Sequence, residues 1–189
     1  DEVHYVLGFN PPLKANLKAY VEGAGSLYVS DWSYDIIEDT WPDEINFFGD
    51  DTQNSDAEIG AGRQTYNASV LDSGLQQYLG ADSIAVEFKF DYFAVASSVA
   101  AGVTTFLQAD EKYHVNDGEQ TLPLSPMTVG FNDGDGRVIF TSFHQEQDAS
   151  NPCTQTSDCD AGFDCVENAC TAQIDGPEDQ VLRYIIFSL

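Results

Sequence analysis

The chain has 189 residues, which is long enough for one well-buried domain. Its hydrophobic content of 42% and aromatic content of 12% exceed those of disordered acidic segments, so we expect it to fold. Seven Lys and Arg against 32 Asp and Glu give a net charge of −25, which repels phosphate backbones and excludes nucleic acid as a partner. The sequence contains no run of about 18 apolar residues, so we predict no membrane span.

The first part of the chain alternates strand and helix signals. Residues 1–9 are rich in β-branched and aromatic side chains and end in an Asn-Pro-Pro loop, which predicts a strand. Apolar residues at helical spacing over residues 13–21 predict an amphipathic helix, which a glycine-rich turn ends. Residues 26–29 predict a buried strand. A strand, a helix and a strand in this order predict a parallel pair with a right-handed crossover.

The remaining elements complete a predicted α/β domain that covers residues 1–189. After a short helix and an acidic surface loop at residues 43–63 come strands at 65–71, 84–92, 103–108, 127–131 and 138–143, and helices at 73–79 and from residue 177. An Asn-Asp-Gly-Asp-Gly sequence predicts a hairpin between the last two strands. We therefore predict an open, mostly parallel, flavodoxin-like sheet that helices flank, with one antiparallel hairpin.

Four cysteines lie close together in an insert that we place at residues 148–176, and they are Cys153, Cys159, Cys165 and Cys170. Their C-x5-C-x5-C-x4-C spacing is wider than the C-x2–4-C pairs of zinc sites, so we predict two disulfides whose pairing stays open. Disulfides are typical of oxidising compartments. Asn67 begins an Asn-Ala-Ser glycosylation sequon, which agrees with export. We predict a secreted or cell-surface protein.

Two segments resemble the class I glutamine amidotransferase-like fold. LKAYVEGAGSLYVSDW, from residue 17, is similar to its helix, glycine turn and strand, and GRVIFTSFHQE, from residue 136, is similar to its late strand ending in H-x-E. In catalytic members a G-x-C-x-G turn holds a cysteine nucleophile that the H-x-E residues activate. The matching turn here is Val29-Ser30-Asp31-Trp32-Ser33, which has Asp31 where the family has its thiol. The resemblance implies the fold without the thiolate chemistry.

The same resemblance implies that strands precede the point that matches Asp1. The fold is then either shortened, or Asp1 is a processed end and a partner chain or further copies complete the sheet. The insert's D-C-x-x-G-F-x-C sequence also resembles short cysteine-rich repeats of extracellular bacterial proteins.

Three interpretations of Asp31 follow. It caps the next helix, it lies in a non-catalytic binding site, or it acts as a carboxylate nucleophile. Our leading hypothesis is a secreted or cell-surface, non-catalytic module for binding or assembly, within a larger extracellular assembly or a processed precursor. The alternative is an extracellular hydrolase that uses Asp31, His144 and Glu146.

An acidic loop offers a calcium site, because Ca²⁺ takes six to eight oxygen ligands. The candidate ligands are Asp50, Asp51, Asp56 and Glu58. A solvated loop is the alternative. The excess of acidic residues also resembles the surface of proteins adapted to high salt, where charge repulsion is screened.

Overall fold

The computed structural model describes residues 10–49, 57–88, 93–143, 155, 159, 163–166, 169–172 and 176–187. The chain divides into two compact units, Asp1–His144 and Gln145–Leu189. The division falls close to the start that we predict for the cysteine insert. The predicted first strand, at residues 1–9, lies outside the described residues.

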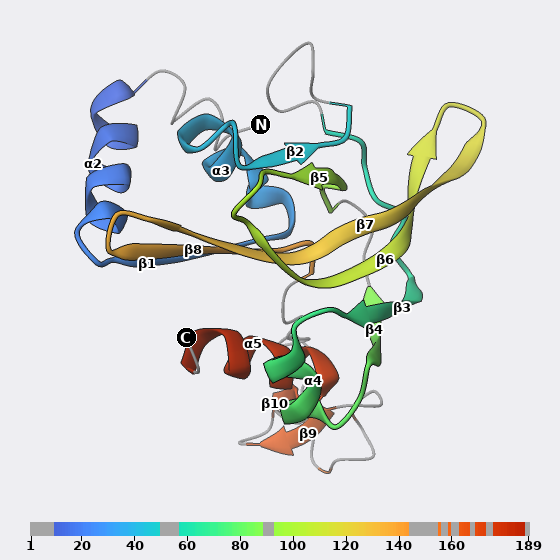
Figure 1. Cartoon of the computed structure of the whole chain (residues 1–189). Helices are drawn as coiled ribbons and strands as arrows, with labels where there is room; N and C mark the ends of the chain where they lie inside the picture. The colour runs from blue at the N-terminus through green and yellow to red at the C-terminus, as the bar shows by residue number, and fades with distance from the viewer. Residues whose placement is uncertain are drawn as a thin grey trace. The chain divides into compact units, whose positions relative to one another are not determined.

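A six-stranded sheet forms the centre of the first unit (Figure 1). Its strand order is β1 (Ser26–Ser30), β8 (Gly136–Thr141), β7 (Gly118–Asp133), β6 (Thr104–Val115), β3 (Gln64–Val70) and β4 (Ser83–Phe88). β1 pairs with β8 in parallel, and each other neighbouring pair in this sheet is antiparallel. The described fold is therefore rich in antiparallel strands.

The predicted open, mostly parallel α/β sheet is wrong. Two-residue connections join β6 to β7, through residues 116–117, and β7 to β8, through residues 134–135. Connections this short permit only antiparallel neighbours, because a parallel crossover needs a dozen or more residues. The resemblance to the class I glutamine amidotransferase-like fold implied a parallel sheet, and this topology contradicts it as well.

Several predicted elements are confirmed. The helix predicted from residue 13 is α2 (Pro11–Glu22), in which Asn10 caps the first turn by accepting from Leu13 N at 3.2 Å. The predicted helix at 73–79 is α4 (Ser73–Leu79), which Asp72 caps by accepting from Leu75 N at 2.7 Å. The short helix after β1 is a 3₁₀ turn, η1 (Asp31–Tyr34), followed by α3 (Asp35–Thr40).

Other strands differ from the predictions in length or in existence. β6 continues to residue 115 and β7 begins at residue 118, so these two strands form a long hairpin instead of two short strands. The loop predicted at residues 43–63 contains β2 (Ile45–Phe47), which pairs with an unpredicted strand, β5 (Ala96–Val99). A strand of three or four residues is too short to show clear alternation in the sequence.

One hydrophobic core lies between the long strands and the elements that cover one of their faces. Figure 1 shows α2, α3 and the β2–β5 pair on the same side of β1, β8 and β7. Phe47 is fully buried there, with its ring centroid 5.1 Å from that of Phe140 and 4.9 Å from that of Tyr34. Trp41 is also buried and contacts Phe131 edge to face. This core fixes where β1 ends, and hence where Asp31 lies.

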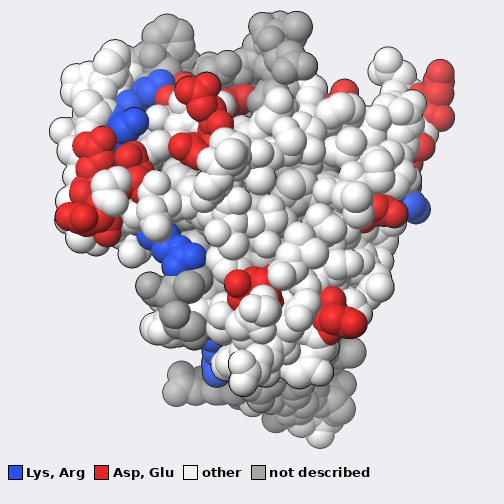
Figure 2. Space-filling model, viewed as in Figure 1, with Lys and Arg blue, Asp and Glu red and all other residues white. Residues whose placement is uncertain are grey.

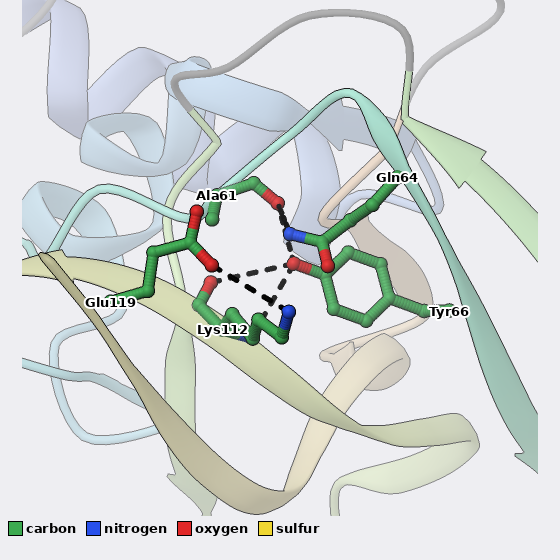
Figure 3. Close-up of polar contacts among 5 residues, drawn as sticks. All are labelled: Ala61, Gln64, Tyr66, Lys112 and Glu119. Carbon is green, nitrogen blue, oxygen red and sulfur yellow. Dashed lines mark hydrogen bonds and ion pairs between the residues drawn. The ribbon is translucent and has the colours of Figure 1, made fainter.

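A tyrosine clamp holds the segment before β3 against β6 (Figure 3). The Tyr66 hydroxyl donates to the carbonyl oxygen of Ala61 at 2.5 Å and lies 3.5 Å from that of Lys112. Gln64 Nε2 donates to the same Ala61 oxygen at 2.8 Å, and Ala61 N donates to Lys112 O at 2.8 Å. The clamp therefore adds one buried and one partly buried side-chain hydrogen bond to a backbone contact.

Replacing Tyr66 by Phe is expected to lower the free energy of unfolding by about 1–2 kcal/mol, since the hydroxyl lies in a buried contact and Gln64 still satisfies Ala61 O. Urea unfolding of the full chain measures this change. Lys112→Met is the control, because its ammonium makes only an exposed pair with Glu119 at 3.6 Å and should matter by less than about 1 kcal/mol. Equal losses in the two variants would contradict the clamp.

The second unit contains a short hairpin and the last helix. β9 (Phe163–Val166) pairs with β10 (Ala169–Ala172) in antiparallel orientation, and α5 (Pro177–Phe187) begins at the predicted proline. Cys159 and Cys165 each take part in a disulfide. The structure describes no side chain of Cys153 or Cys170, so it does not define the predicted pairing.

Candidate functional site

Asp31 lies at a sharp turn where β1 passes into η1. Its φ is 55°, in the left-handed region that non-glycine residues seldom occupy, although Asp tolerates it better than most. The N-cap position of η1 belongs to Ser30, so Asp31 is the first residue of this helix and does not occupy the predicted N-cap position. Its side chain is partly exposed. Strained backbone of this kind costs about 1–3 kcal/mol and clusters at functional sites.

Hydrogen bonds join the end of β1 to the end of β8. Ser30 and Thr141 are the last residues of β1 and β8 and lie opposite each other in the parallel register. Asp31 and Ser142 directly follow them in the chain. The Tyr28 hydroxyl lies 2.8 Å from Thr141 Oγ1, which in turn lies 2.5 Å from Phe143 O. Burial raises the pKa of Tyr28, hydrogen bonds with Thr141 and Ser30 oppose this, and the charge of Asp31 adds to it.

A row of buried polar side chains continues from Ser142 across the sheet. Ser142, Ser125 on β7 and Glu111 on β6 are fully buried. Ser125 Oγ hydrogen-bonds to Glu111 Oε2 and, at 2.7 Å, to the carbonyl oxygen of Ala96 on β5. Ser142 Oγ donates to the carbonyl oxygen of Met127 at 3.4 Å. The interior of the sheet therefore holds an acid that is hydrogen-bonded to Ser125.

Glu111 is protonated at neutral pH. Burial raises the pKa of its carboxyl to about 8, and the neighbouring hydroxyls of Ser125 and Ser142 offset only part of this rise. The geometry agrees, because a serine has one proton and Ser125 donates it to the Ala96 carbonyl, so the proton shared with Glu111 comes from the carboxyl. Glu111 Oε1 has no hydrogen-bond partner, which makes a charged carboxylate still more costly.

The structure describes only some of the predicted site residues. Asp31 lies at the turn described above, whereas His144 and Glu146 lie outside the described residues. The structure therefore does not test the predicted triad of these three residues. Asn67 is exposed on β3, where it pairs with Ala85.

The predicted calcium ligands Asp50, Asp51 and Asp56 also lie outside the described residues, and Glu58 is partly buried. Within the described ranges, no group of three or more His, Cys, Asp or Glu residues could hold a metal ion. The predictions of calcium, of assembly and of an extracellular location therefore gain no support from the structure.

The polar row was not predicted, although the sequence holds a signal for Glu111. Along β6 the buried residues Ala109, Glu111 and Tyr113 alternate with exposed Asp110 and Lys112. The prediction missed this alternation because it ended the strand at residue 108. A glutamate at an inward position of an alternating strand is the pattern that identifies it.

On the described surface that Figure 2 presents, acidic side chains form separate patches and cover more of the face than basic side chains do. This distribution agrees with the 32 acidic against seven basic residues of the sequence. The resulting field opposes the approach of anionic ligands and favours neutral or cationic ones.

The described part of the chain belongs to the β-rich class of folds, and within its residues no helix is long and apolar enough to cross a membrane. No family model and no curated protein matches the sequence.

One similar solved structure is a cold-adapted β-galactosidase from Rahnella sp. R3, with 11% sequence identity and a TM-score of 0.43. Another is a β-galactosidase from Bacillus circulans sp. alkalophilus, with 11% identity and a TM-score of 0.41. Each match covers 70% of this chain and 18% of the β-galactosidase chain. A cytoplasmic protein from Salmonella typhimurium is also similar, with 13% sequence identity and a TM-score of 0.39; the match covers 68% of this chain and 47% of that protein. The chain spans less than half of each of these proteins, and we base no conclusion on likenesses this low.

Proposed function

We propose that the chain is a non-catalytic binding module whose ligand contacts Asp31 at the end of β1. The left-handed conformation of Asp31 carries the proposal. Asp31 is a partly exposed residue that keeps a costly backbone conformation. A fold retains such strain where the position of the side chain matters.

The surrounding groups favour a neutral, polyhydroxylated ligand such as a carbohydrate. The Asp31 carboxylate accepts hydrogen bonds, and the hydroxyl of Tyr28 on β1, whose pKa is raised by burial and by the charge of Asp31, both donates and accepts them. Trp32 is partly exposed next to Asp31, and its ring packs edge to face against Tyr34 at 5.3 Å. An aromatic ring beside hydrogen-bonding groups suits a ligand with both apolar and hydroxyl-bearing faces. The acidic surface disfavours anionic ligands.

Binding of the full chain to an array of neutral glycans, compared with Asp31→Asn, tests the proposal. Asn also tolerates the left-handed conformation, so the variant keeps the turn and loses only the charge. A hydrogen bond to a charged group contributes about 1.5–3 kcal/mol, so we expect Asp31→Asn to weaken binding roughly 10- to 100-fold. Glu119→Gln makes the same charge change on the exposed β6–β7 hairpin and should bind as the wild type does. Unchanged affinity in Asp31→Asn would overturn the proposal.

The hydrolase remains a second candidate because of the same turn. A strained strand-to-helix turn is how some hydrolases present a nucleophile, and a carboxylate can act as one. Turnover of nitrophenyl esters and glycosides by the wild type, lost in Asp31→Asn and in His144→Ala, would favour this candidate. Glycan binding without turnover favours the binding module.

A further inference from the structure

The Tyr28 hydroxyl lies at the end of β1, at the level of the residue that precedes Asp31. Tyr28 is opposite Ile139 in the parallel register, whereas its hydroxyl lies 2.8 Å from the hydroxyl of Thr141, further along β8. Thr141 is in turn opposite Ser30, the last residue of β1. The tyrosine side chain therefore leans along the strand, toward the turn that carries Asp31.

The number of available protons fixes the direction of the hydrogen bonds at this point. The Thr141 hydroxyl lies 2.5 Å from the carbonyl oxygen of Phe143, and because a carbonyl can only accept, Thr141 donates its single proton there. In the contact with Tyr28, the oxygen of Thr141 must then accept and Tyr28 must donate. Thr141 is fully buried, so bulk water does not compete for this bond. The Tyr28 proton is therefore committed to Thr141.

A ligand at the Asp31 site meets Tyr28 as an acceptor. Tyr28 is 39% exposed, and with its proton committed only the lone pairs of its oxygen remain. The Asp31 carboxylate is an acceptor as well. We propose that Tyr28 is a specificity-determining residue of this site, where it accepts a hydrogen bond from a free hydroxyl of the carbohydrate. The inference rests on the proposed function for the ligand class and adds which members of that class bind.

Two acceptors distinguish ligand groups of similar size. A hydroxyl donates and accepts, whereas a fluorine in its place cannot donate and would bring lone pairs against the Tyr28 oxygen. A site built to hydrogen-bond a hydroxyl discriminates against an analogue that lacks it. Burial and, to a smaller extent, the charge of Asp31 raise the pKa of Tyr28, so the phenol keeps its proton at neutral pH. The ligand therefore needs unmodified hydroxyls at two positions, one for each acceptor.

Fluorinated sugars test the proposal on the full chain. The probes are the methyl glycosides of glucose, galactose and mannose, and the forms of each in which fluorine replaces one hydroxyl. For a parent sugar that binds, we expect fluorine at the position facing Tyr28 to weaken wild-type binding about 2- to 10-fold. Tyr28→Phe should bind the parent sugar more weakly by the same factor and should lose nothing further on this substitution. Fluorine at the position facing Asp31 should weaken binding in both proteins.

Thr141→Val tests the direction of the proton. This variant releases the Tyr28 hydroxyl, which can then turn its proton toward the fluorine, so the loss at that position should shrink to less than twofold. Thr141→Ser, which returns a hydroxyl, should restore the wild-type loss. Tyr20→Phe is the matched control, because it removes a hydroxyl that lies 3.4 Å from Ser26 O at the start of β1, and it should bind each sugar as the wild type does.

Equal fluorine losses in the wild type and Tyr28→Phe at each position would overturn the proposal and leave the proposed function in place. Wild-type tolerance of fluorine at each position would overturn it as well, because Tyr28 would then donate to the ligand or not touch it. If Thr141→Val does not fold, the comparison of the wild type with Tyr28→Phe still decides. A lack of binding to every parent sugar would remove the proposed function together with the role of Tyr28.

Discussion

Glu111→Gln is expected to be more stable than the wild type by about 5 kcal/mol above pH 8. The folded protein holds the Glu111 proton up to a pKa of about 8, whereas the unfolded chain releases it near 4.5. Between these pH values the folded state binds more protons than the unfolded state, so the free energy of unfolding of the wild type falls as the pH rises. The stabilisation by protonated Glu111 is complete below pH 4.5 and is lost by pH 8. Each unit of difference corresponds to about 1.4 kcal/mol.

Urea unfolding at pH 4.5, 6.5 and 8.5 measures this difference. At pH 4.5 the two proteins should agree within about 1 kcal/mol, because Gln resembles the protonated acid in shape and hydrogen bonding. The repulsion among the many surface carboxylates changes with pH in both proteins and cancels in their difference. Glu119→Gln, at an exposed position, should show no such pH-dependent gain. A constant difference across this range would show that Glu111 is ionised in the folded protein.

Gly136→Ala is expected to lower the free energy of unfolding by more than about 3 kcal/mol. A Cβ at residue 136 would lie closer than 3.0 Å to the backbone carbonyl oxygens of Val21 and Gly25, which belong to the end of α2 and the turn after it. Backbone atoms that hydrogen bonds hold cannot move aside as a flexible side chain can, and Arg137 N donates to Gly25 O at 3.0 Å. Overpacking of this kind costs about 1–3 kcal/mol or more.

Gly23→Ala is the matched control at the same junction. Gly23 has an ordinary φ of −87°, and its Cβ would lie 3.2 Å from Ala19 O, so we expect a loss below about 1 kcal/mol. Thermal and urea unfolding of both variants measure the contrast. Similar losses in the two variants would mean that α2 does not pack closely against the β7–β8 hairpin.

Local sequence signals predicted the elements whose ends are marked by capping residues. α4 follows the capping residue Asp72, and Gly80 in the left-handed conformation ends it, so both ends are encoded within a few residues. The long β6–β7 hairpin was not predicted in full, because polar side chains cover its outer part and the apolar alternation stops. Asp31 was selected because it stands where the amidotransferase-like fold has its thiol, a resemblance that the sheet topology contradicts, and its left-handed conformation has no signal in the sequence.

The sequence by itself determined the negative charge, the helices and most strands. These properties depend on composition and on residues within one or two turns of one another. Only the tertiary structure decided that the sheet is mostly antiparallel and that Ser125 and Glu111 form a buried hydrogen-bonded pair. Strand order and register are contacts between residues far apart in the chain. The protonation of Glu111 depends on that burial, since an acid in an exposed strand keeps its ordinary pKa.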